Sequence, residues 1–580
     1  MRKRFMAAFV ALVLVGNLSA QEREVVDAVM RFIGVDSPEE LDAAEVERLE
    51  DFLDRPLCIN MVSQSRLAAS GLLSPYQAAS LSDYRARHGN VMSFTELSAV
   101  DGFGPDAVRK LRPFISLEYH QVHESVMEPR HDFALKSAYK AAGAPVISDW
   151  NYGLKYRLRT DRLMASVGLS RPYSAATPWP ASYTVSFSCD FRWGRVVAGD
   201  FNARFGQGLA LWSGAFMTSL SSPDAFMKKP SGISETFSFT GSSALTGIAG
   251  TFSMKRLTLT VLTAVPGIKS ARSAPEKIAL KPAANLSWRG RFGQVSLSHV
   301  MGLSGWNVQG VRIPSMLTSC DAAFCLRGVN VYGEALYDWD YQNIHAVAGT
   351  DFRVSEIVRM AALVRYLPTR SEGTAAQHGV ALSAAFGTQQ NRHAGVLTAD
   401  VVRYVEPKDK SVPHSIQAKL LGDWKFKVDE HWDIKLRLSE RLRTWGYHFR
   451  TDLRADVSYV SEPWVLNMRM NALWCVHTGF VSYLEEGRKT SSMSIYLRQG
   501  IFLVDDWEDR IYVYERDAPG SFNVPAMYGR GWFAGAVASV RINRTIRLYA
   551  RASYTGYQFM PREKRKPGKA ELKLYILSTF

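Results

Sequence analysis

The chain has 580 residues, of which 47% are hydrophobic and 22% charged, and its formal net charge is +15. Its length far exceeds one ordinary globular core, and its five cysteines are too few for a disulfide framework. Behind the first 20 residues there is no run of about 18 apolar residues, which excludes a helical membrane protein.

Residues 1–20 have the three parts of a secretory signal peptide. A basic start at residues 2–4 precedes an apolar run at residues 5–15, and a small-residue cleavage site follows at residues 18–20. We therefore expect an exported protein whose mature chain begins at Gln21.

Charge is distributed unevenly along the remainder. Residues 22–117 carry 10 Lys or Arg against 16 Asp or Glu, which is a net charge of −6. The signal peptide contributes +3, so residues 118–580 carry +18. Such an asymmetry indicates two parts with different partners.

Residues 21–55 predict an acidic helical lead-in. Val25, Val29 and Phe32 recur at helical spacing. The stretch Ser37-Pro38-Glu39-Glu40 has the composition of a helix start, because Ser can cap, Pro suits the first turn and Glu there complements the helix dipole. We expect this segment to pack on the helices that follow it.

Residues 56–117 contain two glycine-bearing turns, Gly71-Leu72-Leu73-Ser74 and Gly102-Phe103-Gly104. A Tyr-Arg-x-x-x-Gly segment lies at residues 84–89, and an Arg-Pro-Phe ending lies at residues 112–114. Together these features resemble the tandem helix-hairpin-helix domain of the competence DNA receptor ComEA. The resemblance covers about 60 residues and implies a small all-α domain that contacts DNA.

In a helix-hairpin-helix motif, glycines let the backbone turn tightly, and the next helix presents N–H groups to a phosphate. The resemblance assigns tentative DNA-phosphate contacts to Gly102, Phe103, Gly104, Arg109 and Lys110. Two features depart from the family pattern: the first hairpin keeps one glycine, and Asp106 puts a carboxylate where a phosphate would dock. The domain could bind DNA, plug a barrel or dock a periplasmic protein.

Residues 118–131 form a polar connector with three histidines, which we expect to be a solvated linker without a metal site. From residue 132 to residue 580, short alternating strands dominate. In residues 151–160, for example, aromatic and aliphatic side chains alternate with Lys155, Arg157 and Arg159. In a barrel the apolar face meets lipid and the charged face lines the lumen.

The last residues alternate as well, with Leu572, Leu574, Ile576 and Phe580 on one face. We count roughly 24 candidate strands, with a range of about 20–26. The predicted fold is therefore mainly β, a large antiparallel outer-membrane β-barrel that follows a small all-α N-terminal domain. We expect the helical domain to lie in the periplasm or inside the barrel.

Basic side chains recur on the predicted inner faces of the strands. They are Lys155, Arg157, Arg159, Lys435, Arg437, Arg441, Arg547 and Arg551. A cationic lumen attracts anionic solutes, an acidic plug or nucleic acid. A barrel of this width would leave an open channel unless something occupied its lumen. The N-terminal domain, an inward loop or a partner protein could do so.

Residues 199–214 contain four glycines that interrupt an alternating strand pattern. They resemble a recurrent segment of exported proteins that join a helix-hairpin-helix domain to a predicted barrel, a resemblance that implies no activity. Glycines in a wall permit a kink or the close approach of another backbone. We expect a structural bend here, followed by a long loop at residues 215–240. A basic loop at residues 562–569 is expected outside the cell.

We find no phosphate-binding loop, zinc motif or nucleophile elbow, so we expect no catalytic residues, no cofactor and no enzymatic activity. The leading expectation is translocation or binding of macromolecules at the outer membrane, with DNA uptake as its concrete form. The alternatives are a scaffold that docks a periplasmic or outer-membrane protein, and a plugged channel for anionic solutes. Expected partners are outer-membrane lipid, DNA or another polyanion, and such a protein.

Overall fold

The computed structural model describes residues 22–117, 129–141, 149–266, 279–304, 315–369, 375–409 and 412–580, apart from short internal gaps at 55, 161, 174, 192, 215–219, 240–243, 291, 327, 388–390, 413, 491, 544 and 560–566. The predicted signal peptide, most of the polar connector and most of the basic stretch 562–569 lie outside the described residues.

The N-terminal part is helical, as expected. Its helices are α2 (Glu22–Ile33), η2 (Pro38–Glu40), α3 (Ala43–Asp54), α4 (Gln64–Ala69), α5 (Pro75–His88), α6 (Phe94–Ser98), α7 (Pro105–Leu111) and η3 (Arg112–Phe114). Serine caps start several of them, and Ser74 forms a reciprocal capping box with Gln77 at the start of α5. None of the described helices is long and apolar enough to cross a membrane.

One hydrophobic core unites these helices. Phe32 and Leu49 from the lead-in are buried together with Leu67, Leu97 and Phe114 from the hairpins. Two short parallel strands, β1 (Leu57–Cys58) and β2 (Ile115–Ser116), tie the ends of the hairpin region together. The lead-in and the hairpins are therefore one domain, which we call the helical domain (residues 22–117).

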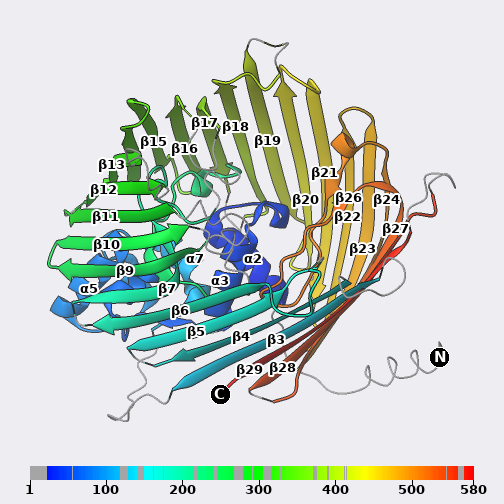
Figure 1. The fold of residues 1–580 in the computed structure, drawn as a ribbon. Helices are drawn as coiled ribbons and strands as arrows, with labels where there is room; N and C mark the ends of the chain where they lie inside the picture. The colour runs from blue at the N-terminus through cyan, green and yellow to red at the C-terminus, as the bar shows by residue number, and fades with distance from the viewer. Residues whose placement is uncertain are drawn as a thin grey trace.

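The rest of the described chain forms a closed antiparallel barrel of 24 strands (Figure 1). The strands are β3 (Arg130–Ala141), β4 (Trp150–Arg159), β5 (Leu163–Arg171), β6 (Ser182–Phe191), β7 (Gly194–Arg204), β9 (Leu245–Met254), β10 (Leu257–Pro266), β11 (Ala279–Arg289), β12 (Gly293–Ser304), β13 (Ser315–Leu326), β14 (Val329–Asp338), β15 (Asn343–Arg353), β16 (Val358–Leu367), β17 (Gln377–Phe386), β18 (His393–Tyr404), β19 (Ser415–Lys427), β20 (Trp432–Arg443), β21 (Phe449–Ser461), β22 (Trp464–Trp474), β23 (Thr478–Lys489), β24 (Met493–Val504), β27 (Gly529–Arg541), β28 (Ile546–Gly556) and β29 (Lys569–Thr579). The predicted fold class is confirmed.

The barrel closes between its first and last strands. Strand β29 pairs with β3 in antiparallel register, and the backbone N–H of His131 donates to the carbonyl of Phe580 at 2.8 Å. Because His131 belongs to this pairing, the wall begins at Arg130, slightly before the expected boundary at residue 132. His131 therefore belongs to the wall and not to the connector.

The two ends of the barrel differ. At the end that holds Arg130 and Thr579, which we call the turn end, the connections are short, as between β9 and β10 or between β21 and β22. At the opposite end, which we call the loop end, two long loops fold into the lumen. Loop 205–244 carries η5 (Pro223–Ala225) and β8 (Gly232–Glu235), and loop 505–528 carries η8 (Trp507–Asp509), β25 (Ile511–Tyr512) and β26 (Ala526–Met527).

The outer face of the wall is apolar. Leu382, Leu397, Leu453 and Leu574 are each about half exposed on outward positions. Exposed aromatic side chains gather near both rims: Trp193, Trp288, Phe386, Trp432 and Trp464 toward the turn end, and Trp150, Tyr183, Tyr366, Trp474 and Tyr554 toward the loop end. An apolar belt between two aromatic girdles, on a wall without free edges, is the surface of an outer-membrane barrel.

Candidate functional site

Helices α2, α3 and α7 of the helical domain lie inside the ring of strands (Figure 1). Its acidic side chains meet basic side chains of the wall, and we call this contact the plug interface. The pairs place lead-in residues against strands β4 and β20–β22, and hairpin residues against β11 and β15. The opposite charges of the two parts of the sequence thus meet within one molecule.

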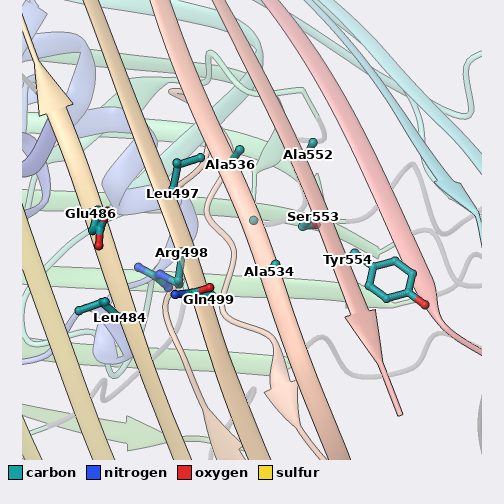
Figure 2. A pocket seen from close by; sticks show the side chains of 11 residues that line it. Leu484, Glu486, Leu497, Arg498, Gln499, Ala534, Ala536, Ala552, Ser553 and Tyr554 are labelled. Atoms are coloured by element: carbon teal, nitrogen blue, oxygen red, sulfur yellow. The ribbon is translucent and has the colours of Figure 1, made fainter. Parts of the chain in front are cut away.

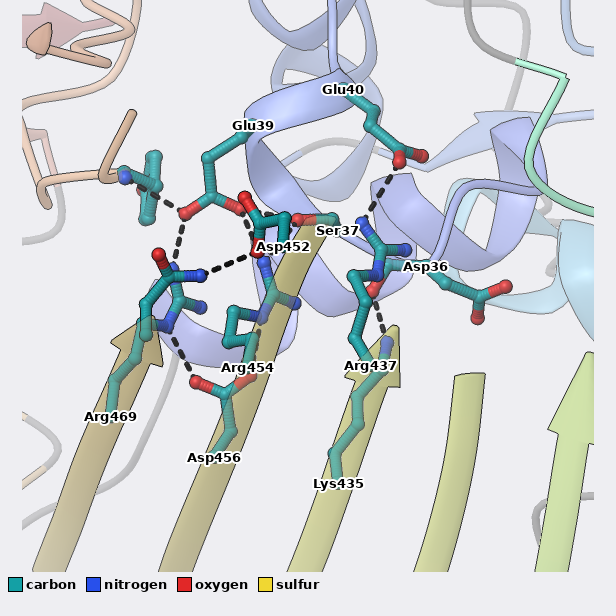
Figure 3. Close-up of polar contacts among 12 residues, drawn as sticks. Asp36, Ser37, Glu39, Glu40, Lys435, Arg437, Asp452, Arg454, Asp456 and Arg469 are labelled. Atoms are coloured by element: carbon teal, nitrogen blue, oxygen red, sulfur yellow. Dashed lines mark hydrogen bonds and ion pairs between the residues drawn. The ribbon is translucent and has the colours of Figure 1, made fainter. Parts of the chain in front are cut away.

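Glu39 is the centre of the most enclosed part of the plug interface (Figure 3). One carboxylate oxygen accepts from Arg469 at 2.5 Å and from the backbone N–H of Tyr514 at 3.0 Å, and the other accepts from Arg454 at 3.2 Å. Asp456 lies between the same two arginines, at 2.5 Å from Arg469 and 2.9 Å from Arg454. Burial on its own would raise the pKa of Glu39, but Arg469 and Arg454 hold that pKa well below its usual value.

Neighbouring residues continue this network along β20. Glu40 binds Arg437 at 2.9 Å, and Arg437 also binds Asp423 of β19 at 2.7 Å. Lys435 donates to the backbone carbonyl of Asp36. The carboxyl group of Asp36 is different, because burial raises its pKa to about 6 despite the nearby Lys435.

A second group of pairs joins α3 to strand β4. Lys155 binds Glu47 at 2.6 Å. Arg157 holds both carboxylate oxygens of Asp51, at 2.9 and 2.6 Å, and also binds Asp132 at 2.7 Å. Bidentate guanidinium–carboxylate pairs fix orientation as well as distance. The lead-in is therefore held to the wall from two separate sets of strands.

The hairpins contact the wall and loop 205–244 through fewer pairs. Asp83 binds Arg289 at 2.8 Å, and Asp106 binds Arg353. Asp224 of loop 205–244 binds Lys110 at 2.5 Å. Its second oxygen binds Arg359 of β16, also at 2.5 Å, so the loop bridges the helical domain and the wall.

The five residues with tentative DNA-phosphate roles lie together on the second hairpin. Gly102 and Gly104 have φ angles of +83° and +103°, which the tight turn requires, and Phe103 packs partly into the helical core. The guanidinium of Arg109 lies 3.6 Å from Asp106, and Lys110 is engaged by Asp224. Both cations thus already face carboxylates of this chain. Their DNA role stays a prediction.

The predicted basic inner face divides into distinct groups. Lys155, Arg157, Arg159, Lys435 and Arg437 contact the helical domain. Arg551 instead contacts Glu515 of loop 505–528 and Glu571 of β29, and Arg547 donates to the hydroxyl of Tyr549 at 3.1 Å. Arg441 lies 3.5 Å from the hydroxyl of Tyr447 at the loop end, away from the plug interface.

The glycine-rich segment wraps a buried carboxylate, a contact that the sequence pattern does not indicate. Glu334 of β14 accepts backbone N–H groups of Gln207, Leu209 and Ala210 at 2.7, 3.0 and 3.2 Å. A Cβ atom at Gly206 would lie 2.7 Å from a Glu334 oxygen, so the close approach requires glycine. The positive φ angles of Gly206 and Gly208 turn the chain around this anion. The expected bend is present, and its contacts with Glu334 anchor the start of loop 205–244.

Two lysines follow on the same loop. Burial lowers the pKa of Lys228 to about 7 and that of Lys229 to about 8. Lys229 donates to the carbonyl of Phe32 at 3.1 Å and lies 4.0 Å from the centre of that ring. These contacts add a second tie between loop 205–244 and the helical domain.

Cavities occur on both sides of the wall. A groove of about 510 Å³ opens on the outer face across β23, β24, β27 and β28, where Ala534, Ala536 and Ala552 leave space beside Leu497 and Tyr554 (Figure 2). Inside the lumen, a cavity of about 490 Å³ lies between the helical domain, β4 and the inward loops. A smaller lumen cavity lies at the loop end.

One cluster of the described residues has the donor types of a metal site. His477, Asp506 and Asp509 each offer a ligand atom within 4.8 Å of the others at the loop end. The carboxylate of Asp509 already accepts the backbone N–H groups of Val476 and His477, at 3.1 and 2.9 Å. His477 also contacts Asp506 directly. These contacts account for the cluster as a loop-fixing network.

Comparisons with known proteins give a general likeness to barrels. No family model and no curated protein sequence matches the chain. Among solved structures, the siderophore receptor PirA from Pseudomonas aeruginosa matches with a TM-score of 0.39 and 8% identity, covering 78% of this chain and 80% of that one. The translocation pore of the P pilus usher PapC matches with a TM-score of 0.37 and 8% identity, covering 78% and 99%.

A third match is Wzi from Escherichia coli, described as a carbohydrate-binding outer-membrane barrel involved in capsule assembly. Its TM-score is 0.35 and its identity 10%, over 74% of this chain and 95% of that one. The assignment of the fold rests on the strand pairing and the apolar belt of this chain itself.

Proposed function

We propose that this protein is a plugged outer-membrane channel for anionic solutes, with the helical domain as its plug. The observation that carries the proposal is the plug interface, in which carboxylates of the helical domain neutralise guanidinium and ammonium groups of the lumen. An acidic plug in a basic lumen suits an anion path, because the wall charges that hold the plug would attract an anion once the plug moves.

Ion current across a planar bilayer tests this proposal. The full chain should conduct weakly, whereas the double variant Glu39→Lys with Asp51→Lys should conduct anions in preference to cations, because repulsion displaces the plug. Glu430→Lys, an exposed residue of a turn, serves as a matched control and should leave the current unchanged. A folded double variant that stays closed, or that prefers cations, would contradict the proposal.

Macromolecule translocation, with DNA uptake as its concrete form, is the second candidate. It is favoured by the open turn at Gly104, where a Cβ atom would meet nothing within 4 Å, and by the 58% exposure of the Arg109 side chain. It is disfavoured by the carboxylates that face Arg109 and Lys110. Binding of duplex DNA to the full chain at two salt concentrations tests it.

In this version, Arg109→Glu should abolish salt-sensitive DNA binding, while Arg87→Glu should weaken it only slightly. Arg87 is the matched control because it lies in the same domain with a side chain 72% exposed. Equal DNA binding by both variants would mean that the second hairpin does not provide the DNA contact. Recovery of a periplasmic protein by the hairpin face, without DNA binding, would favour the scaffold alternative.

A further inference from the structure

Four arginines line the smaller lumen cavity at the loop end. Arg441 and Arg443 lie on β20, Arg450 lies on β21, and Arg510 lies on loop 505–528. The cavity has a volume of about 270 Å³, and its other lining residues are Ser439, Tyr447, Asp452, Glu508 and Tyr512. We call it the arginine cavity. It is separate from the plug interface, which lies deeper in the lumen.

Within the part of the chain that the structure describes, the guanidinium groups of the arginine cavity have only neutral hydrogen-bond partners. Arg443 donates to the side-chain oxygen of Gln417 at 2.9 Å, and Arg450 donates to the backbone carbonyls of Glu508 and Arg510 at 2.5 and 2.8 Å. Arg510 donates to the backbone carbonyl of Trp507 at 2.7 Å and lies 2.9 Å from the hydroxyl of Tyr512.

Arg441 is the least satisfied of the four. Its only hydrogen bond within the described residues is the long one to Tyr447, and its buried Nε atom makes none. Across the described part of the chain, none of the four guanidinium groups lies within 4.0 Å of a carboxylate oxygen.

The contrast with the plug interface is direct. There, Arg437, Arg454 and Arg469 each contact two carboxylates. In the arginine cavity, four positive charges meet two negative ones, from Asp452 and Glu508, which leaves a net charge of +2. Unpaired like charges in a partly enclosed space repel one another, and an anion relieves that repulsion.

We propose that the arginine cavity binds a phosphate-bearing anion, either inorganic phosphate or a small phosphate monoester. Guanidinium groups present planar forks of N–H donors that match phosphate oxygens in pairs. A phosphate monoester carries about −1.5 to −2 at pH 7, which balances the net charge of the cavity. The volume admits a phosphate group with a small organic substituent, and the hydroxyls of Tyr447 and Tyr512 add polar contacts.

The source of the phosphate is a solute. Arg441 and Arg443 alternate with outward-facing Leu442 and therefore point into the lumen, whereas lipid headgroups meet the outer face. The proposal deepens the proposed function by naming a substrate class, and it rests on that function only for the passage of the ligand. Binding at the cavity is measurable without any current.

Calorimetry on the full chain in detergent, with inorganic phosphate as the probe, tests the site. We expect one phosphate per chain, and at least a tenfold weaker affinity in Arg441→Gln and in the double variant Arg441→Gln with Arg443→Gln. Arg530→Gln is the matched control, because Arg530 lies at the same end but is held by Asp505 at 2.5 and 2.6 Å. It should bind phosphate as the parent does.

Each result decides the proposal. Absence of phosphate binding by the parent, or equal loss in Arg530→Gln, would overturn it. Binding only of phosphate-bearing lipid micelles would also overturn it, since the site would then belong to the outer surface. If the double variant fails to fold, the single variant and the parent still decide. Phosphate binding in a protein that never conducts anions would support the site while removing the proposed function.

Discussion

The lead-in and the second hairpin belong to one helical domain, yet they meet the barrel in opposite ways. Glu39 of the lead-in touches two arginines whose side chains are 7% and 9% exposed. Asp106 of the hairpin pairs with one arginine of the wall, Arg353, whose side chain is 41% exposed. Ion pairs enclosed from water cost far more to break than exposed ones. The lead-in is therefore expected to be the firmer attachment of the helical domain to the wall, and the second hairpin the more accessible one.

The largest effect on this contrast should come from Glu39→Lys. The substitution leaves Arg454 and Arg469 facing a third cation, so we expect the free energy of unfolding to fall by about 3–5 kcal/mol. Thermal denaturation in detergent and protease access to the helical domain measure it. The control Glu430→Lys should change neither. An unaffected melting curve would mean that the lead-in is not the anchor.

Asp51→Asn should have a smaller effect of the same sign. The substitution removes the bidentate pair with Arg157, but Arg157 keeps Asp132. We therefore expect a loss of about 1.5–3 kcal/mol, the range for hydrogen bonds to charged groups. The same melting assay measures it. A loss as large as that of Glu39→Lys would show that both contact regions hold the plug equally.

Asp36 provides a test of opposite sign within the lead-in. Its pKa in the folded protein is about 6 against an ordinary value of 3.8, so ionisation opposes folding above pH 6, and this cost disappears as the pH falls below 3.8. Asp36→Asn should raise the free energy of unfolding by up to about 3 kcal/mol at pH 7.5, at about 1.4 kcal/mol per pKa unit, and change it little near pH 3.5. A stabilisation that persists at low pH would contradict this account.

Glu39 should behave in the reverse manner. Because Arg469 and Arg454 hold its folded pKa below the unfolded value, its contribution is complete above about pH 4.5 and is lost as the pH falls further. Melting curves of the parent and of Glu39→Gln should therefore converge at low pH. Curves that remain parallel would assign the effect of Glu39 to packing.

The smallest effect belongs to the hairpin. Asp106→Ala breaks pairs with two largely exposed arginines, so we expect a change of at most about 1 kcal/mol. Protease access to the helical domain should stay as in the parent. The exposed cationic face of α7 gains one net positive charge. Release of the plug by this single change would invert the roles of the two regions.

The sequence predicted the wall well, because alternation is a local signal. The outward positions of Leu572, Leu574 and Ile576 are confirmed, as is the strand count. The charge asymmetry indicated an acidic plug in a basic lumen as one of several outcomes. Which partners meet was not predictable, since Glu39 and Arg469 are joined only by the final register of the strands.

Two contacts of the lumen were not predicted, because each joins segments that lie far apart in the sequence. The wrapping of Glu334 by residues 206–210 joins segments more than a hundred positions apart, and only the run of glycines hinted at it. No sequence pattern predicts that loop 505–528 folds inward. Arg516 of this loop binds Glu485 of strand β23 at 2.9 Å. Arg441 was identified as a lumen residue, but its neighbours Arg450 and Arg510 were not.

Among the described residues outside the helical domain, the only hydrophobic side chains that pack against its core are Tyr514 and Phe522 of loop 505–528. The domain's attachment to the wall is thus chiefly ionic, while hydrophobic packing holds its own helices together. Departure from the lumen would not require melting: the domain could withdraw as an intact body. Added salt should loosen the exposed pairs of the second hairpin before the enclosed pairs of the lead-in, because enclosed charges are screened much less.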